Sequence, residues 1–372
     1  MLRSRKFLKI LSCAITVAII VLILQMKEEH VRDKFLILQE EYEQEDIKQE
    51  QLVDLHNFQY RINSKLCKKF DRELLGVMIV TSYVGHDELR SAHRQAISQT
   101  KLNEMGLIRV FLLAEIPPRE TFINQKQIED EQRKFGDLVQ GNFLEAYRNL
   151  TYKHVMGLKW AVTECPKAKF LIKIDDDSVF DIFFIKSYLE TLELRDSVKN
   201  FMAGYILDNK KPIRVSASKW FVSLDEYGGD AYPDYLSGWL YLTNQRVARN
   251  LVKESQHARF FWIDDTFVTG ILRDSIAVPL IRLNNWFSAN SEFFDCCVRD
   301  LKDHSYECEF YVGPNGGDNK LLIEFVHEVE KCYFDECVKR SPEMGLRQTC
   351  VAKVKNLVSD HGKALVRAVP IR

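Results

Sequence analysis

One short stretch in the middle of the chain, residues 169–180 (KFLIKIDDDSVF), constrains the fold more than any other part of the sequence. Apolar residues surround Lys173, and the run then ends in three consecutive carboxylates, Asp175, Asp176 and Asp177. A short apolar run with an abrupt polar end predicts a buried strand rather than a surface helix. In an open α/β sheet, ligands bind beyond the carboxyl ends of the strands. The stretch therefore predicts a strand that delivers acidic side chains to a binding edge.

The three adjacent aspartates allow two interpretations. Neighbouring carboxylates repel one another unless a cation lies among them. An Asp-x-Asp pattern supplies the oxygen ligands that Mg²⁺ or Mn²⁺ shares with substrate phosphates. The alternative is a solvated acidic turn or the acidic first turn of a helix, which needs no ligand. The triplet by itself leaves both interpretations open.

Length and charge limit the kind of protein this can be. With 372 residues the chain can form one large domain with extensions, or two modest domains. The 52 Lys and Arg residues nearly balance the 53 Asp and Glu residues, which gives a net charge of −1. This balance argues against nucleic acid as a partner.

The amino terminus predicts a membrane anchor. Residues 1–9 are rich in Lys and Arg, and residues 10–25 form an apolar run that acidic residues follow. A cleaved signal peptide is the alternative, but no small-x-small site follows the run. The charge distribution places a cytosolic tail before an uncleaved signal-anchor, with the rest of the chain lumenal. Because the span is short, a Golgi membrane, crossed once in type II orientation, is the predicted location.

The cysteines agree with an oxidising compartment. Cys13 lies in the predicted span, which leaves an even number outside it, and this number favours disulfides whose pairing the sequence does not reveal. A zinc site is the competing interpretation, but paired C-x₂-C spacings are missing. The eight remaining cysteines are Cys67, Cys165, Cys296, Cys297, Cys308, Cys332, Cys337 and Cys350.

Three segments follow the predicted anchor. Residues 26–73 are polar and charged, and they predict a stem, with a weak self-association helix as the alternative. Residues 74–290 alternate apolar strand-like runs (75–82, 109–114) with helical patterns (87–100, 121–135, 142–165), which predicts an α/β sandwich around a mostly parallel sheet. Residues 291–372 carry six cysteines and predict a disulfide-stapled appendage.

Two later stretches contain further candidate site residues. Residues 219–241 are rich in aromatic residues and glycine, which fits either a sugar-sized cleft or a core strand with a tight turn. Asp264 and Asp265 precede an apolar helical pattern, where they could serve a site or simply favour a helix start. Asn149 begins an N-glycosylation sequon, although it lies inside a predicted helix.

Five blocks of the sequence, in order, resemble the β-1,3-glycosyltransferases, a family of galactosyl- and N-acetylglucosaminyltransferases related to Fringe. The resemblance covers roughly residues 74–287. The blocks are Arg90-x-x-x-Arg94, residues 111–113 (FLL), residues 142–153 (NFLEAYRNLTYK) with the nearby Trp160 and Cys165, Lys173-x-Asp175-Asp176-Asp177, and residues 232–241 (YPDYLSGWLY).

The resemblance implies a GT-A-like nucleotide-sugar-binding fold and a Mn²⁺- or Mg²⁺-dependent inverting transferase. The implied reaction moves a hexose or N-acetylhexosamine, galactose first among them, from a UDP-sugar to a glycan hydroxyl in β-1,3 linkage, on a glycoprotein, glycolipid or proteoglycan. Asp265 would be the general base, and Asp175 and Asp177 would hold the metal. Asp175, Asp176, Arg90, Arg94 and Lys173 would bind the donor, and Trp220, Tyr235, Gly238 and Asp264 would lie on the acceptor side.

Two departures from the family pattern motivate an alternative function. The family's Glu-Asp-Val block is Asp264-Asp265-Thr266 here, and a late metal-binding histidine is replaced by residues 316–318 (GGD), with His304 and His327 only nearby in sequence. The alternative is a catalytically silent Golgi lumenal relative that binds glycans or assists another transferase, as a chaperone does.

Overall fold

The computed structural model describes residues 47–194, 200–335, 337–351, 358–359 and 362–363. The predicted cytosolic tail, the signal-anchor at 10–25 and the first part of the predicted stem, residues 26–46, lie outside these residues. Among the helices that can be described, none is both long and apolar enough to cross a bilayer.

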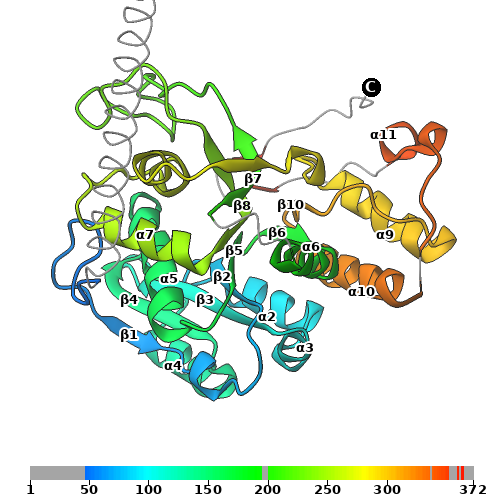
Figure 1. Ribbon diagram of the computed structural model, residues 1–372, viewed down its shortest axis with the longest axis horizontal. Helices are drawn as coiled ribbons and strands as arrows, with labels where there is room; N and C mark the ends of the chain where they lie inside the picture. The colour runs from blue at the N-terminus through cyan, green and yellow to red at the C-terminus, as the bar shows by residue number, and fades with distance from the viewer. Residues whose placement is uncertain (1–46, 195–199, 336, 352–357, 360–361, 364–372) are drawn as a thin grey trace, which may run out of the picture. The chain divides into compact units, whose positions relative to one another are not determined.

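An eight-stranded sheet forms the centre of the fold (Figure 1). The four strands β4, β3, β2 and β5 run parallel, β9 is parallel to β7, and β1, β8 and β7 each join a neighbour antiparallel. The predicted α/β class is therefore confirmed, and the sheet is mostly parallel as expected: because β8 is antiparallel to both β5 and β7, six of the eight strands run in one direction and only β1 and β8 run in the other. Its order is β1 (Tyr60–Asn63), β4 (Leu138–Leu144), β3 (Leu107–Glu115), β2 (Gly76–Thr81), β5 (Phe170–Asp175), β8 (Tyr235–Asn244), β7 (Met202–Leu207) and β9 (Leu280–Arg282).

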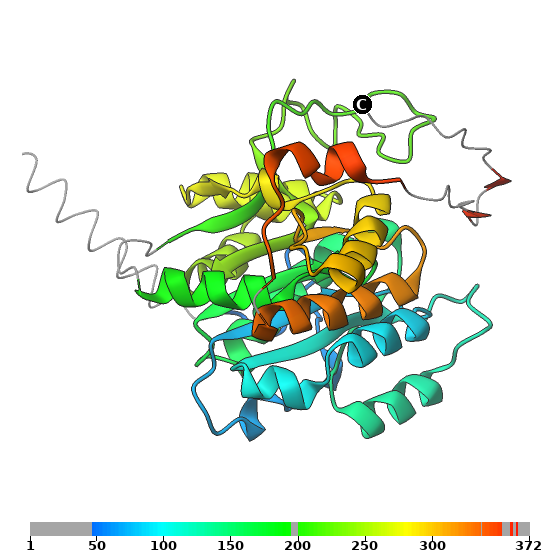
Figure 2. The ribbon, with the colours of Figure 1, turned by 90° about the vertical axis from the view of Figure 1, so that its right-hand side faces the viewer.

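Helices cover both faces of this sheet (Figures 1 and 2). The helices α5 and α7 pack on one face, against the central strands and each other, and α2, α3, α6 and α10 form a connected layer on the other face. Central strands that are covered on both sides must be apolar throughout, as β2 (GVMIVT) is. The helices are α2 (Asp87–Ala96), α3 (Gln99–Glu104), α4 (Gln125–Phe135), α5 (Leu150–Glu164), α6 (Ile182–Leu194), α7 (Gln245–Ser255), α8 (Arg273–Ser275), α9 (Glu292–His304), α10 (Asn319–Asp335) and α11 (Leu346–Thr349).

Local signals explain where several helices begin and end. The side chain of Asn124 accepts the backbone N–H of Gln127, and the Gln127 side chain accepts the backbone N–H of Asn124, so a capping box starts α4. Gly136 ends the helix with a left-handed φ of 73°. The predicted helix at 87–100 is two helices, because the chain is extended at Ile97 and Ser98 caps α3.

The predicted helix at 142–165 begins later than the sequence indicates. Residues up to Leu144 belong to β4, which pairs with β3 and β1, and helix α5 starts only at Leu150. Pairing on both sides overrides a helical spacing of apolar residues, since local propensity is a weak determinant beside tertiary contacts.

The folded unit begins earlier than the predicted start at residue 74. The compact unit starts at Gln49. Within the segment interpreted as stem, Leu52 and Phe58 are buried, and β1 pairs with β4. The sequence YRIN alternates apolar and polar residues, but a run of only four residues, with polar neighbours on both sides, is too short to predict a strand.

The carboxyl-terminal segment is part of the same unit and not a separate appendage. Strand β10 (Val312–Pro314) pairs antiparallel with β6 (Ser178–Phe180), which directly follows the acidic triplet. Phe294 of α9 packs edge-on against Phe325 of α10, and both belong to the core cluster shared with α6. The cysteine-rich segment is therefore part of a packed layer of the fold.

Disulfides join all eight cysteines outside the predicted span, which confirms the preference for disulfides over zinc. The pairs are Cys67–Cys165, Cys296–Cys350, Cys297–Cys308 and Cys332–Cys337. The first pair ties the segment after β1 to the end of α5, 98 residues away, whereas the last closes a separation of only 5.

These two loop lengths predict unequal losses of stability on removal. The entropy that a disulfide removes from the unfolded chain grows with loop length, so C67S/C165S should lose about 4 to 5 kcal/mol of unfolding free energy and C332S/C337S about 2 kcal/mol. Urea unfolding of the two double variants measures the difference. Equal losses would contradict an origin in loop closure.

Candidate active site

The acidic triplet lies where the sequence predicts it, at the carboxyl end of a buried strand. Strand β5 ends at Asp175, and Asp176 and Asp177 form the turn into β6. The backbone N–H of Asp176 donates to the Thr81 carbonyl of β2 at 3.1 Å, so the turn continues the sheet. Asp175 is half-buried, Asp176 is buried and Asp177 is exposed.

Asp176 is held by two histidines from the α2 layer. The His86 ring donates from Nδ1 to Asp176 Oδ2 at 2.9 Å, and His93 Nε2 donates to the Asp176 carbonyl at 2.9 Å. Burial, with a smaller contribution from the Arg109 charge, lowers the pKa of His93 to about 4, so this ring is neutral. The Asp176 carboxylate therefore anchors the turn, and Asp175 and Asp177 are the carboxylates left to face a ligand.

The turn at Asp177 is supported from the far end of the chain. The Asp177 carbonyl accepts the backbone N–H of Asn315 at 2.8 Å, just beyond β10. This is the segment where the family pattern would place a late histidine, and here it presents Asn315 and glycines. The two nearby histidines contact other groups, since His304 lies against Tyr306 and His327 bonds to the Gln95 carbonyl.

Lys173 connects the triplet to the second acidic pair. Its fully buried Nζ donates to Asp175 Oδ1 at 2.6 Å and to the Gly238 carbonyl at 2.8 Å, and it lies 3.9 Å from Asp265 Oδ1. Burial lowers the pKa of Lys173, but the carboxylates of Asp175, Asp265 and Asp264 outweigh burial and raise that pKa above its ordinary value. Lys173 is therefore a permanent positive charge between the two carboxylate sites.

His154 of α5 is a site residue that the sequence does not reveal. This fully buried ring donates from Nδ1 to Asp264 Oδ2 at 3.0 Å, and its Nε2 accepts the Tyr241 hydroxyl at 2.7 Å. A carboxylate can only accept, which fixes this tautomer. His154 lies among helix residues that are nearly all buried, so its position alone resembles an ordinary core position.

The two aspartates of the second pair have opposite electrostatic environments. Burial raises the pKa of Asp264, but the His154 hydrogen bond and the Lys173 charge outweigh it and hold that pKa below its ordinary value. Burial and the adjacent Asp264 raise the pKa of Asp265 well above its ordinary value. Asp265 is thus the stronger base of the pair.

One group of three side chains has the spacing that a metal ion needs. Among the described residues, His154, Asp264 and Asp265 form the group of three or more such side chains whose ligand atoms lie within 4.8 Å of one another. Both nitrogens of His154 already have partners, as described above. The carboxylates are therefore the ligands that this group can offer.

Packing after Asp265 fixes its backbone. Residues Thr266–Leu272 form a π-helical segment where the sequence predicts an ordinary apolar helix. The Thr269 hydroxyl donates to the Asp265 carbonyl at 2.7 Å and accepts the Leu236 N–H of β8 at 2.8 Å. This link positions Asp265 against the strand that carries Gly238.

Gly238 makes room for the Asp265 carboxylate. A Cβ at this position would lie 2.6 Å from both carboxylate oxygens of Asp265. We expect Gly238→Ala to push the carboxylate aside and to lower the rate of any reaction that uses Asp265 about 10²-fold, as a misplacement of about 1 Å can do. Initial rates and melting temperature measure the two effects separately. The matched control is Gly345→Ala, whose nearest neighbour would be 3.5 Å away and whose rate should not change.

A cavity of about 550 Å³ opens beside Asp264 and Asp265. The predicted acceptor-side residues Trp220 and Tyr235 line it together with Tyr147 and Trp262, and Trp220 Nε1 donates to the Tyr147 hydroxyl at 3.0 Å. Aromatic side chains with a few polar groups are typical of a small-molecule site. The structure thus brings Trp220, Tyr235 and Asp264 to one cavity, with Gly238 behind Asp265.

Arg90 and Arg94 lie in a buried ion-pair cluster and not in this cavity. The five N–H groups of Arg90 donate to both carboxylate oxygens of Glu131, to the Ser82 hydroxyl, and to the carbonyls of Tyr83 and Val84. Arg94 pairs with Glu131 and Asp137. Arg90 therefore has no donor left for a nucleotide, and the arginines hold α2, α4 and the loop after β2 together.

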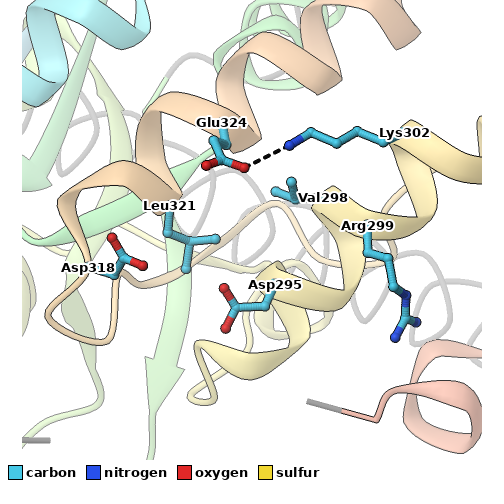
Figure 3. A pocket seen from close by; sticks show the side chains of 7 residues that line it. All are labelled: Asp295, Val298, Arg299, Lys302, Asp318, Leu321 and Glu324. Atoms are coloured by element: carbon cyan, nitrogen blue, oxygen red, sulfur yellow. Dashed lines mark hydrogen bonds and ion pairs between the residues drawn. The ribbon is translucent and has the colours of Figure 1, made fainter. Parts of the chain in front are cut away.

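A second hollow, of about 250 Å³, lies between α9 and α10 (Figure 3). Its walls are charged, and Lys302 of α9 pairs with Glu324 of α10 at 2.7 Å across the gap. It contains none of the residues that the sequence predicts for catalysis or binding. The aromatic cavity beside Asp265 is therefore the candidate substrate site.

The predicted sequon at Asn149 lies at the junction before α5. Asn149 Nδ2 donates to the Leu144 carbonyl at 2.8 Å, and the fully buried Thr151 hydroxyl donates to the Phe261 carbonyl at 2.7 Å. Because both side chains of the sequon are engaged, glycosylation at Asn149 would have to precede folding, and it stays a prediction.

Comparison with known proteins identifies the class of protein that carries this cavity: the chain is a glycosyltransferase. A family model described as Galactosyltransferase matches residues 90–284, more than half of the 372 residues, so the chain belongs to the galactosyltransferase family. The resemblance noted from the sequence blocks is thereby confirmed.

Several curated relatives and solved structures are similar to the chain. It is 30% identical to human beta-1,3-galactosyltransferase 5 over 266 residues (70% of this chain, 80% of the relative). It is 32% identical to mouse beta-1,3-galactosyltransferase 1 over 250 residues (64% and 72%). Among solved structures, the bifunctional glycosyltransferase WbbM aligns over 72% of this chain and 52% of its own, at 13% identity and a TM-score of 0.34.

Proposed function

We propose that this protein is an inverting glycosyltransferase that moves a hexose or N-acetylhexosamine, galactose first among them, from a UDP-sugar to a glycan hydroxyl in β-1,3 linkage. One observation carries the proposal. The Asp265 carboxylate borders the aromatic cavity, and Lys173 lies between it and Asp175 at the edge of the sheet. An inverting displacement needs this separation, with a base on one side of the reacting carbon and the leaving phosphate on the other.

Asp265 is the general base in this proposal. A sugar hydroxyl is a weak nucleophile, so a carboxylate within hydrogen-bond reach takes its proton during attack. Asp264, held ionised by His154 and Lys173, raises the basicity of Asp265 through its charge. Lys173 keeps the two acidic sites at a fixed separation, because it contacts Asp175 and the Gly238 carbonyl at the same time.

The residues at the sheet edge fit a divalent cation. Asp175 and Asp177 offer carboxylate oxygens, the ligands that Mg²⁺ and Mn²⁺ prefer, and Asp177 is exposed. Burial raises the pKa of Asp175, and the neighbouring Asp177 adds to this rise while Lys173 opposes it. When bound, the ion would neutralise charge on the leaving diphosphate. The anchored Asp176 would keep both ligands oriented.

The proposed location follows from the sequence, with residues 10–25 anchoring a single-pass type II Golgi membrane protein whose catalytic part is lumenal. Its partners would then be a UDP-sugar and a glycan on a glycoprotein or glycolipid. The lumenal space is also oxidising, as four disulfides require.

The test is a donor screen with and without metal. Full-length protein in detergent is incubated with each of several UDP-sugars and Mn²⁺, and UDP release is measured with and without glycan acceptors. We expect release with one donor, UDP-galactose first, loss of release with EDTA, recovery with excess Mn²⁺, and a β-configured product by NMR. Absence of UDP release from every donor would favour the catalytically silent, glycan-binding alternative.

A further inference from the structure

Two exposed lysines line the aromatic cavity. Lys210 and Lys211 line it together with Asp264 and Asp265. The aspartates have partners, since Asp264 accepts from His154 and Asp265 lies 3.9 Å from Lys173. Within the described ranges, no carboxylate forms an ion pair with either lysine. The nearby Asp208 carboxylate pairs with Arg282; this hydrogen bond, with a smaller contribution from the Lys210 charge, lowers the pKa of Asp208. The cavity therefore presents positive charge that no ion pair within the described ranges neutralises.

The lysines lie in a segment that the fold holds in place. The Lys210 carbonyl accepts the Tyr232 N–H at 2.8 Å, and Asp208 pairs with Arg282 of β9 at 2.8 Å. Arg214, three residues after Lys211, donates to four backbone carbonyls of the same segment, those of Val222, Ser223, Tyr227 and Gly229. The backbone beneath the lysines is thus fixed on both sides.

The position of the lysines favours the acceptor over the donor. The cavity lining includes the proposed base, Asp265, but none of the three aspartates of the triplet, where the donor diphosphate is proposed to bind. A third cation lies close by, because the Lys219 ammonium is 4.4 Å from the ring centre of Trp220, another lining residue. An anion bound here would therefore belong to the acceptor glycan and not to the donor.

We propose that the acceptor of this enzyme is an acidic glycan, with a carboxylate or phosphate on the acceptor sugar or its neighbour that Lys210 and Lys211 bind. This inference rests on the proposed transferase function and adds its acceptor class. Ammonium groups bind both kinds of anion as point charges, so carboxylate and phosphate share one recognition chemistry here. The aromatic lining provides surfaces for the apolar faces of the sugar rings.

The experiment compares matched acceptors that differ only at C6. Methyl β-galactoside, its 6-carboxylate (the galacturonide) and its 6-phosphate, with the same three forms of methyl β-N-acetylglucosaminide, are tested with the full-length protein and the donor found in the screen. The readout is the preference, the ratio of kcat/KM for an acidic acceptor to that for its neutral parent. We expect a preference of roughly tenfold, as two ion pairs at a cavity mouth can give, and a decrease at high salt.

Two variants test the assignment to the lysines. In K210Q/K211Q the preference should fall towards one, mainly through a higher KM for the acidic acceptor. The control K126Q removes an exposed lysine on α4 and should retain the preference. The acceptor form with the larger preference, carboxylate or phosphate, identifies the acidic group that the lysines bind.

The outcomes separate this inference from the proposed function. Transfer to neutral and acidic acceptors at equal kcat/KM would overturn the inference while leaving the transferase intact, and so would a preference that K210Q/K211Q does not change. Failure to release UDP from any donor would instead overturn the transferase function on which the inference rests.

Discussion

Asp265→Asn should abolish most transfer activity while leaving the protein folded. The amide has nearly the same shape, so it fits beside Gly238, but it cannot take a proton from the acceptor hydroxyl. General-base catalysis contributes about 10² to 10⁴-fold, and we expect kcat to fall by that factor with little change in the KM for the donor. Because burial disfavours the charged form of Asp265, the melting temperature should be unchanged or higher.

Asp274→Asn is the matched control for this variant. Asp274 is an exposed carboxylate in α8 that pairs with Arg273, nine positions beyond the proposed base. Its removal should leave kcat within about twofold, as a surface substitution does. Near-normal transfer by Asp265→Asn would assign the base to another residue, with Asp264 the next to test.

Lys173→Met should cause a large loss of stability, together with loss of activity. Met fills a similar volume, but Asp175 and the Asp264–Asp265 pair would lose the buried charge that separates them. Removing one partner of a buried charge network typically costs about 3 to 5 kcal/mol. Denaturant unfolding measures this loss, and the transfer assay should show that the remaining folded protein is inactive, since both acidic sites contact Lys173.

Two further variants show whether the cause is charge. Lys302→Met removes the exposed pair with Glu324 in the second hollow (Figure 3) and should cost no more than about 1 kcal/mol. Lys173→Met/Asp175→Asn removes a carboxylate along with the lysine and should be more stable than the sum of the single losses predicts. Strict additivity would indicate that Lys173 stabilises the fold through packing alone.

Sequence analysis predicts those parts of the site whose residues are consecutive in the chain. An apolar run that ends in three aspartates already contains the strand, its end and its ligands, so β5 and its turn are as expected. Asp264 and Asp265 are likewise adjacent in sequence and adjoin the cavity that Trp220 and Tyr235 line.

The parts that sequence analysis misses are those created by distant partners. His154 becomes a site residue only because folding brings Asp264, 110 positions away, to its Nδ1. Arg90 and Arg94 match a family block, but their side chains form ion pairs with Glu131 and Asp137, which lie 37 to 43 positions away. A charged residue in a helical pattern gives no sign of whether its partner is a ligand or another side chain.

The same reason explains the errors in the domain boundaries. Strand β1 has no strong pattern of its own and exists because β4 offers it an edge, with Tyr60 opposite Gly141. The carboxyl-terminal helices have apolar faces that the sequence shows, but nothing local indicates that these faces complete the layer over α2 and α6.

The pairing of β6 with β10 has a consequence for synthesis of the protein. The turn that carries Asp177 can form all of its contacts only after the last quarter of the chain has been synthesised. The reason is that the Asp177 carbonyl accepts the N–H of Asn315. A shortened protein that stops at residue 284, where the family match ends, would contain every proposed catalytic side chain yet leave that turn unsupported. Translation must therefore continue well past residue 284 before the proposed donor site can take shape.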